Sequence, residues 1–408
     1  MIDRRLSVAP MLDWTDRHCR YFLRGFSPRI LLYTEMITAS AILRGDRDRL
    51  LEFGRAEHPV ALQLGGCEPD YLGAATRDAM EFGYDEINLN CGCPSDKVQK
   101  GAFGACLMSE PALVGDCVAA MCEASDVPVT VKMRIGTIRG GGARDAHAMV
   151  REFDERDYDA LCDFIVSIRA AGADAAIIHA RKAVLGGWSP QENREIPPLR
   201  YDIVRRIKED FPDLPVVVNG GIRTVEAAME MLDWCDGVML GREAYHHPMV
   251  LAQIDAAMCA VAGETCETPT VEQMLERMAR YAEDQLARGE RLHAITRHML
   301  GLLSHNKGAR EYRRVLSEGA PGRDAGPEII RRAASLAAGV AGPGGCPNPA
   351  RRVGPVALSR RRKAASACRD RCRSHGDCGS FPHQCTGPPA TARPSWPLLM
   401  ARHARRVY

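Results

Sequence analysis

Between residues 5 and 242, short apolar runs recur along the chain, each followed by loop residues and then by a segment with helical periodicity. The eight runs cover residues 5–11, 30–36, 59–66, 86–92, 128–136, 174–181, 215–221 and 236–242. They are rich in Val, Ile and Leu and nearly continuous, which is typical of strands buried on both faces of a parallel sheet. Eight strand–helix units of this kind predict an α/β fold, a closed (β/α)8 TIM barrel.

An open, doubly wound sheet is the alternative fold. It is disfavoured because no G-x-G-x-x-G sequence follows an early strand. Distinctive residues, most of them polar, instead stand where the runs end: Met11, Glu35, Gln63, Asn90, Lys132, His179, Asn219 and Gly241. The carboxyl ends of barrel strands meet at one mouth, so we expect these residues to converge there.

The chain changes character after the last predicted strand. Residues 249–342 show helical periodicity, with Thr270 as a cap before an amphipathic segment. From residue 343 Pro, Gly, Arg and Ser dominate and the apolar periodicity ends, which predicts disorder. We therefore expect a catalytic barrel at 1–248, a smaller helical domain at 249–342 and a basic tail at 343–408. Within the barrel, the long glycine-rich connection 137–158 indicates an excursion over the mouth or a neutral surface insertion.

Charge is distributed unevenly. Residues 351–408 carry a net charge of +11, whereas the first 350 residues carry −9. A basic tail on an acidic body could help to hold a polyanion, or it could be an extension of skewed composition.

Hydrophobic residues make up 46% and charged residues 26% of the chain, as in ordinary globular proteins. No apolar run is long enough for a membrane span or a secretory signal, so we expect a cytoplasmic protein with no membrane contact. Sixteen scattered cysteines then indicate free thiols in a reducing compartment. Zinc binding in the tail is disfavoured because its Cys and His residues lack paired C-x2-C spacing: Cys368, Cys372, His375, Cys378, His383 and Cys385.

Two glycine turns predict a phosphate site. Asn219-Gly220-Gly221 follows the seventh run, and Gly241-Arg242 follows the eighth. Barrels commonly bind phosphate with the loops after these two strands, because glycines let backbone N–H groups approach the anion. Arg242 can add a charge. The alternative is that the glycines only close tight turns.

Gln63, Lys132 and His179 end the third, fifth and sixth runs. An amide, an ammonium and an imidazole facing one cavity suit a polar planar ring, and Lys132 could stabilise negative charge on a reduced flavin. Each could instead be a satisfied buried polar group, and Lys132 could form a Schiff base, as in an aldolase. The three together favour a ligand site.

Cys93 stands in a Gly-Cys-Pro turn just after the fourth run. A C-x-C pair with no second pair nearby is half a metal site, and a disulfide between residues two apart would be strained. We therefore expect no metal here. Cys91 continues the strand and is expected to be buried packing. Cys93 is expected at the mouth, where a thiol can act as a general acid.

These segments together resemble the tRNA-dihydrouridine synthases, and more closely their A type. The resemblance runs from about residue 7 to 340 and is carried by APMLDWTDRHCRYF, LLYTEM, EHPVALQLGG, GYDEINLNCGCPSDKVQKGAFGACLM, PVTVKMRIG, IIHARKAVLGGWSPQENREIPPL, NGGI and DGVMLGREAYHHP. It implies a barrel holding FMN, a helical domain that helps to hold tRNA, and NADPH as electron donor. The reaction implied is reduction of the C5–C6 double bond of D-loop uridines, with positions 20 and 20a suggested by the A type.

The resemblance also assigns roles to residues. Cys93 would protonate C5, while reduced FMN delivers hydride from N5 to C6. The flavin positions would be Pro10, Met11, Gln63, Lys132, His179, Asn219, Gly220, Gly221, Gly241 and Arg242. Asn90, His179, Arg181 and Lys182 would face the flipped uracil or nearby RNA. No obligate protein partner is implied.

Two other functions remain open from the sequence. One is an FMN-barrel reductase of a free pyrimidine, like dihydroorotate dehydrogenase. The helical domain and the HARKAVLGGWSP segment argue against it. The other is a tRNA-binding module without activity, which the presence of Cys93, Lys132 and His179 disfavours.

Overall fold

The computed structural model describes residues 2–338, apart from 96, 97, 100, 140–149, 151, 305 and 307. The described residues belong to one compact unit. The predicted tail and its cysteines lie outside this range, as does most of the first half of the 137–158 connection. No helix in the described part of the chain is both long and apolar enough to cross a bilayer.

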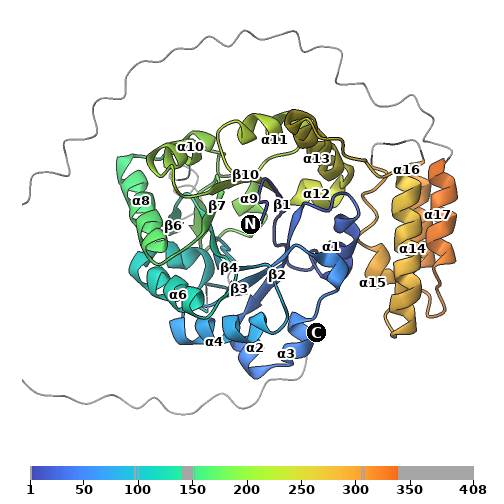
Figure 1. Cartoon of the computed structure of the whole chain (residues 1–408), viewed down its shortest axis with the longest axis horizontal. Helices are drawn as coiled ribbons and strands as arrows, with labels where there is room; N and C mark the ends of the chain where they lie inside the picture. Colours follow the sequence, from blue (N-terminus) through green and yellow to red (C-terminus); the bar gives the residue numbers. More distant parts are fainter. Residues whose placement is uncertain are drawn as a thin grey trace, which may run out of the picture. The chain divides into compact units, whose positions relative to one another are not determined.

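Eight parallel strands close into a barrel (Figure 1). They are β1 (Leu6–Val8), β2 (Leu31–Thr38), β3 (Val60–Gly65), β4 (Glu86–Cys91), β5 (Val129–Arg134), β7 (Ala175–His179), β9 (Val216–Asn219) and β10 (Gly237–Leu240). Each pairs with its neighbours in chain order, and β10 closes the ring against β1. The predicted (β/α)8 barrel is therefore confirmed: seven strands lie inside their predicted runs, and β2 extends two residues beyond the run 30–36.

Helices surround the strands (Figure 1). In chain order they are α1 (Arg17–Arg24), α2 (Ala39–Arg44), α3 (Arg47–Leu51), α4 (Pro69–Met80), α6 (Pro111–Glu123), α8 (Glu155–Ala170), α9 (Glu192–Glu195), α10 (Tyr201–Asp210), α11 (Val225–Leu232), α12 (Arg242–His246) and α13 (Met249–Ala262). Side-chain caps start several of them: Asp16, Thr38, Asp154 and Thr224 each accept a hydrogen bond from a first-turn N–H. The strands are continuous apolar runs because one face packs on these helices while the other fills the barrel.

A small parallel sheet that the sequence analysis missed lies next to the barrel. It pairs β6 (Thr137–Arg139) with β8 (Ala183–Leu185), and these strands come directly after β5 and β7. Ile138, Val184 and Trp188 form a small apolar cluster around it. The start of the 137–158 connection is thus fixed by strand pairing.

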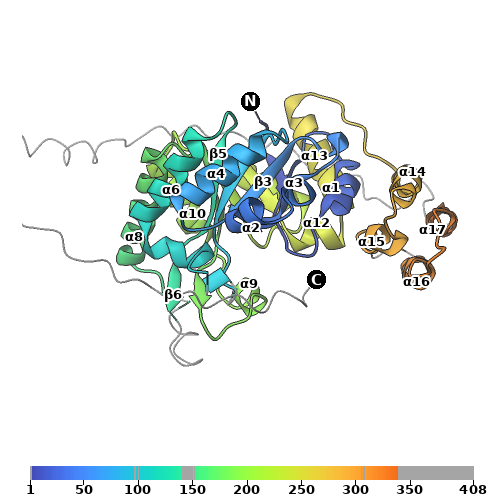
Figure 2. The ribbon, with the colours of Figure 1, turned by 90° about the horizontal axis from the view of Figure 1, so that it is seen from below.

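The chain after the barrel strands is helical, as predicted. Helices α14 (Val271–Ala287), α15 (Leu292–Thr296), α16 (Ala309–Gly319) and α17 (Glu328–Ala338) follow α13 (Figure 2). Thr270 caps α14 in a capping box with Gln273. Helix α17 packs against both α14 and α16, whereas α13 packs against α11 and β1 of the barrel. The domain boundary at residue 248 stays a prediction.

Asp16 links the first barrel helix to the helical region. Its side chain caps α1 at Cys19 N–H (2.9 Å) and also accepts from Arg297 (2.5 Å) and His298 (3.0 Å). Burial opposes the charge of this carboxylate, but His298 and Arg297 outweigh that cost and hold its pKa well below the usual range. Tyr21 of α1 stacks on Tyr281 of α14 with ring centroids 3.9 Å apart.

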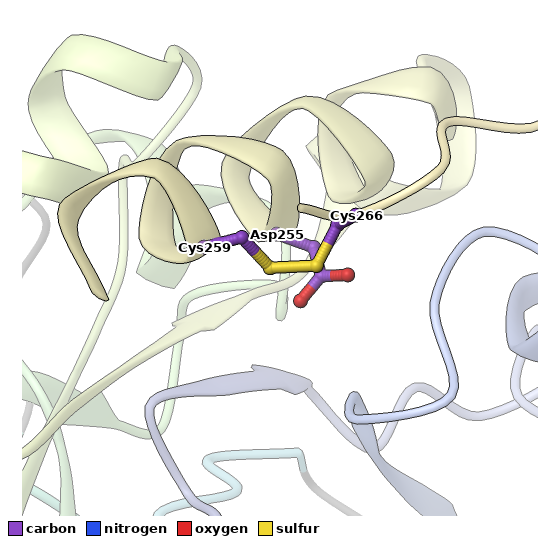
Figure 3. Close-up of side chains that lie close together, drawn as sticks. All are labelled: Asp255, Cys259 and Cys266. Atoms are coloured by element: carbon purple, nitrogen blue, oxygen red, sulfur yellow. A yellow bond between two sulfur atoms is a disulfide. The ribbon is translucent and has the colours of Figure 1, made fainter. Parts of the chain in front are cut away.

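One cysteine pair departs from the expectation of free thiols. Cys259 of α13 and Cys266 form a disulfide, with Cα atoms 6.1 Å apart (Figure 3). Helix α13 ends at Gly263 in the left-handed conformation, which lets the chain turn back towards the helix. The prediction is wrong for this pair because the sequence does not reveal that return.

The same cluster does not make a metal site. Ligand atoms of Asp255, Cys259 and Cys266 lie within 4.8 Å of one another. Arg29, however, donates to both sulfur atoms and to Asp255 Oδ1 (3.0 Å). A guanidinium therefore already holds the place that a cation would take.

Candidate active site

The carboxyl ends of neighbouring strands bring the predicted polar residues together. Asn90 of β4 lies in register with Lys132 of β5, and His179 of β7 lies in register with Asn219 of β9. Lys132 Nζ donates to Asn219 Oδ1 (3.0 Å), and Asn90 Nδ2 donates to Gln63 Oε1 (2.7 Å). The mouth thus carries one continuous polar surface drawn from five strands.

Lys132 lies deep in this mouth. Burial, reinforced by the nearby positive charge of Arg134, lowers its pKa to about 7. Among the described residues, the Asn219 amide oxygen is its one hydrogen-bond acceptor. An ammonium has three N–H donors, so Lys132 is suited to binding an additional electronegative or anionic group.

His179 is neutral at physiological pH. Burial, together with the charges of Arg134 and Lys132, holds its pKa well below the usual range. Gly220 packs directly beside the ring: a Cβ on this glycine would lie 2.5 Å from His179 Cδ2, and its φ is +108°. Only glycine fits there, so part of the Asn219-Gly220-Gly221 turn serves to seat the imidazole.

Gly241 follows β10 and lies beside the chain that continues from β1. A Cβ there would lie 3.8 Å from Ala9 Cβ and from Met11 Sδ, which is an ordinary van der Waals distance. Pro10 and Met11 are partly exposed at this rim. The structure therefore brings the ends of the first and last strands together at one rim.

Cys93 stands in the turn after β4 and is partly exposed. Its N–H donates to Asn90 Oδ1 (2.9 Å), and its Sγ lies 3.5 Å from Ser95 Oγ. Cys91, by contrast, is fully buried. Burial raises the pKa of the Cys91 thiol, so this residue is inert packing, as predicted.

A second loop holds the Cys93 turn from the other side. Ala105 N–H donates to the Cys93 carbonyl oxygen (2.9 Å), and a Cβ on Gly104 would lie 2.6 Å from that same oxygen. Gly104 also has a φ of +72°. The glycine at position 104 is therefore required by this contact and by the local backbone conformation.

Arginines surround the thiol side of the mouth. Arg134 is buried and donates to Gly92 O (3.2 Å) and Asn193 O (3.1 Å), beside the Cys93 turn. Both Arg134 and Arg194 interact electrostatically with Cys93. Sequence reasoning did not single out these two residues, although Arg134 ends β5 and both stand in segments that carry the resemblance.

The predicted basic residues Arg181, Lys182 and Arg242 differ in their surroundings. Arg181 is half-buried, and its Nε has no hydrogen-bond partner among the described residues. Arg242 pairs with Glu195 (2.5 Å). Lys182 is not among the polar side chains that the structure brings together at the mouth. Its Nζ pairs with Asp157 of α8 (2.7 Å), and the Lys182 side chain is 6% exposed.

A closed parallel barrel whose mouth gathers a thiol, a buried amine, an imidazole and several guanidiniums defines a TIM-barrel enzyme. Residues 7–337 match the family model described as dihydrouridine synthase (Dus), and the chain belongs to that family. It is therefore an oxidoreductase of the dihydrouridine synthase class.

Several curated relatives align with this chain over most of their own length. A tRNA-dihydrouridine(20/20a) synthase of Xanthomonas axonopodis pv. citri is 52% identical over 329 residues, which is 81% of this chain and 92% of the relative. Proteins of the same name from Pseudomonas aeruginosa and Pasteurella multocida are 52% and 50% identical, over 78% and 82% of this chain and 90% and 96% of theirs.

Proposed function

We propose that this chain reduces the C5–C6 double bond of D-loop uridines in tRNA, at positions 20 and 20a, in the cytoplasm. FMN is the proposed bound cofactor and NADPH the electron donor. The names of the relatives support the substrate and the positions. The observation that carries the proposal is that Cys93, Lys132 and His179, far apart in sequence, share one barrel mouth.

The residues of the mouth fit a flavin. Lys132 has hydrogen-bonding capacity beyond Asn219, and Gly241 presents backbone without a side chain beside Met11. We assign flavin contacts to Pro10, Met11, Gln63, Lys132, His179, Asn219, Gly220, Gly221, Gly241 and Arg242. When bound, a reduced flavin supplies a hydride.

The proposed role of Cys93 is to donate a proton. Its Sγ–H gives the proton to C5 of the base, and the sulfur is left as a thiolate. Arg134 and Arg194 place positive charge near this sulfur. The turn holds the donor still, because Asn90 and Ala105 fix the Cys93 backbone N–H and carbonyl.

The remaining polar groups are assigned to the RNA. A uridine must leave its stack to reach a barrel mouth. Asn90 uses its oxygen and one N–H within the protein, which leaves one N–H for a uracil carbonyl. Arg181, which is half-buried and whose buried Nε has no hydrogen-bond partner among the described residues, is assigned to the base or a phosphate. His179 would face the same space, and Lys182 would reach RNA only by leaving Asp157.

Replacing Glu195 by glutamine is expected to tighten flavin binding. Glu195 pairs with Arg242, so its carboxylate competes with the flavin phosphate for the guanidinium. Because both groups are partly exposed, we expect about a two- to fivefold lower Kd for FMN, and a smaller effect in high salt. Fluorescence titration of the flavin-free protein measures it.

Glu209→Gln is the matched control, because its ion pair with Arg205 lies within α10, away from the mouth. An unchanged or weaker Kd in Glu195→Gln would remove Arg242 from the proposed phosphate site.

The proposed activity is tested with purified chain, NADPH and tRNA that lacks dihydrouridine. We expect dihydrouridine at positions 20 and 20a, and no reduction of free uracil or oxidation of dihydroorotate. Turnover of a free pyrimidine with no product in tRNA would instead establish the free-pyrimidine reductase considered above.

A further inference from the structure

A chain of hydrogen bonds between buried side chains runs through the inside of the barrel from the Cys93 turn to Glu86. Cys93 N–H donates to Asn90 Oδ1 (2.9 Å), and Asn90 Nδ2 donates to Gln63 Oε1 (2.7 Å). Gln63 Nε2 then donates to Asn88 Oδ1 (2.7 Å).

The chain of hydrogen bonds continues inwards through one residue of β5 and returns to β4. Asn88 Nδ2 donates to Thr130 Oγ1 (2.9 Å), and Thr130 Oγ1 donates to Glu86 Oε1 (2.6 Å). Asn88, Thr130 and Glu86 are each 0% exposed. The bonds among these three residues therefore lie where water cannot replace a lost partner, so breaking one of them costs the full desolvation penalty of the group left unpaired.

The two ends of the chain permit only one direction of donation. The Glu86 carboxylate, which is paired with Arg4, accepts hydrogen bonds, so the Thr130 hydroxyl must donate to it and must accept from the amide nitrogen of Asn88. The backbone N–H of Cys93 only donates, so Asn90 must present its oxygen. Reversing any amide between them would set N–H against N–H, or oxygen against oxygen.

Glu86 is itself fixed at the base of the barrel. Arg4 Nε donates to Glu86 Oε2 (2.7 Å), and Tyr33 OH donates to Oε1 (2.6 Å). The carboxylate is thus a fixed negative end, and it polarises a chain of bonds that all run the same way.

We propose that Glu86 and Thr130 are positioning residues for the reaction at Cys93. Through Asn88, they set which amide atoms Gln63 and Asn90 present to the mouth, and they stiffen the turn that carries the thiol. The inference rests on the proposed role of Cys93. It adds that groups which touch neither substrate nor cofactor determine how well that thiol is placed.

Thr130→Val tests this link most cleanly. Valine keeps the shape of threonine and suits a strand, but it removes the hydroxyl that joins Glu86 to Asn88. Glu86 keeps Arg4 and Tyr33, so its charge stays paired. We expect kcat for dihydrouridine formation to fall about tenfold, with KM for tRNA changed less than about twofold.

A second measurement does not depend on turnover. The rate at which iodoacetamide alkylates Cys93, followed by peptide mass spectrometry, reports the placement of the thiol directly. We expect this rate to change at least about threefold in Thr130→Val. If wild type forms no dihydrouridine, the proposed function fails, while alkylation still decides whether the chain of hydrogen bonds reaches Cys93.

Two variants complete the design. Thr130→Ser restores the hydroxyl and should return both measurements towards wild type. Thr76→Val makes the same change at another site that is 0% exposed, where Oγ1 has no hydrogen-bond partner among the described residues, and should match wild type. Wild-type behaviour of Thr130→Val in both measurements would overturn the inference, as would equal impairment of Thr130→Val and Thr130→Ser.

Discussion

Replacement of Cys93 by alanine is expected to slow dihydrouridine formation at least about 100-fold while leaving the visible spectrum of the bound flavin intact. The side chain is partly exposed in a loop, so its truncation leaves no large cavity. The backbone contacts of the turn, with Asn90 and Ala105, do not involve the sulfur. Nucleoside mass spectrometry of the tRNA measures the product, and absorbance measures the flavin.

Cys106→Ala is the matched control for this experiment. Cys106 is also partly exposed and also lies after β4, in the short 3-10 helix Gly104–Ser109. It is expected to keep wild-type turnover. If Cys93→Ala makes product as fast as Cys106→Ala, the proton comes from another group.

Replacement of Lys132 by methionine is expected to slow turnover at least about 100-fold and to stabilise the flavin-free protein against unfolding. Methionine has a similar size but cannot donate hydrogen bonds to electronegative atoms of the cofactor. In the folded protein, burial favours neutral Lys132, whose pKa is about 7 against 10.5 for an ordinary lysine. Removing that buried charge is expected to raise the free energy of unfolding by about 2 kcal/mol at pH 6.

The sign of the pH dependence follows from proton binding. Between about pH 7 and 10.5 the unfolded chain holds a proton on Lys132 that the folded chain has released. The contribution of Lys132 to the free energy of unfolding of the wild type therefore rises with pH across that window. The difference by which Lys132→Met exceeds the wild type in free energy of unfolding shrinks accordingly. Urea unfolding of both proteins at pH 6 and pH 9 measures this. If the free energy of unfolding of Lys132→Met exceeds that of the wild type by more at pH 9 than at pH 6, the pKa of Lys132 is not lowered.

The barrel was predictable because its strands are buried on both faces and therefore read as continuous apolar runs. The residues that end those runs follow from the same logic: strand direction alone places Asn90 and Lys132 side by side. Short strands such as β6 carry too few residues for a pattern, and β6 is stabilised by its partner β8 rather than by its own sequence. That sheet could not be predicted.

The pairing of side chains was the part that the sequence did not reveal. Lys182 stands next to Arg181, yet one pairs with Asp157 while the other keeps an unpartnered Nε. The buried Arg134 was not singled out, because its contacts with the Cys93 turn depend on Gly92 and Asn193 being folded around it. Such contacts join distant segments, and only the closed barrel brings them together.

The central claim is that this chain adds two hydrogens to a D-loop uridine and that the second comes from Cys93. The most direct measurement is the mass of the D-loop fragment from tRNA treated with purified enzyme and NADPH, using wild type and Cys93→Ala side by side. With wild type, the account predicts a fragment heavier by two hydrogens for each reduced uridine, at positions 20 and 20a, and with the variant an unchanged fragment. An unchanged fragment with flavin-loaded wild type, or equal conversion by both proteins, would contradict it.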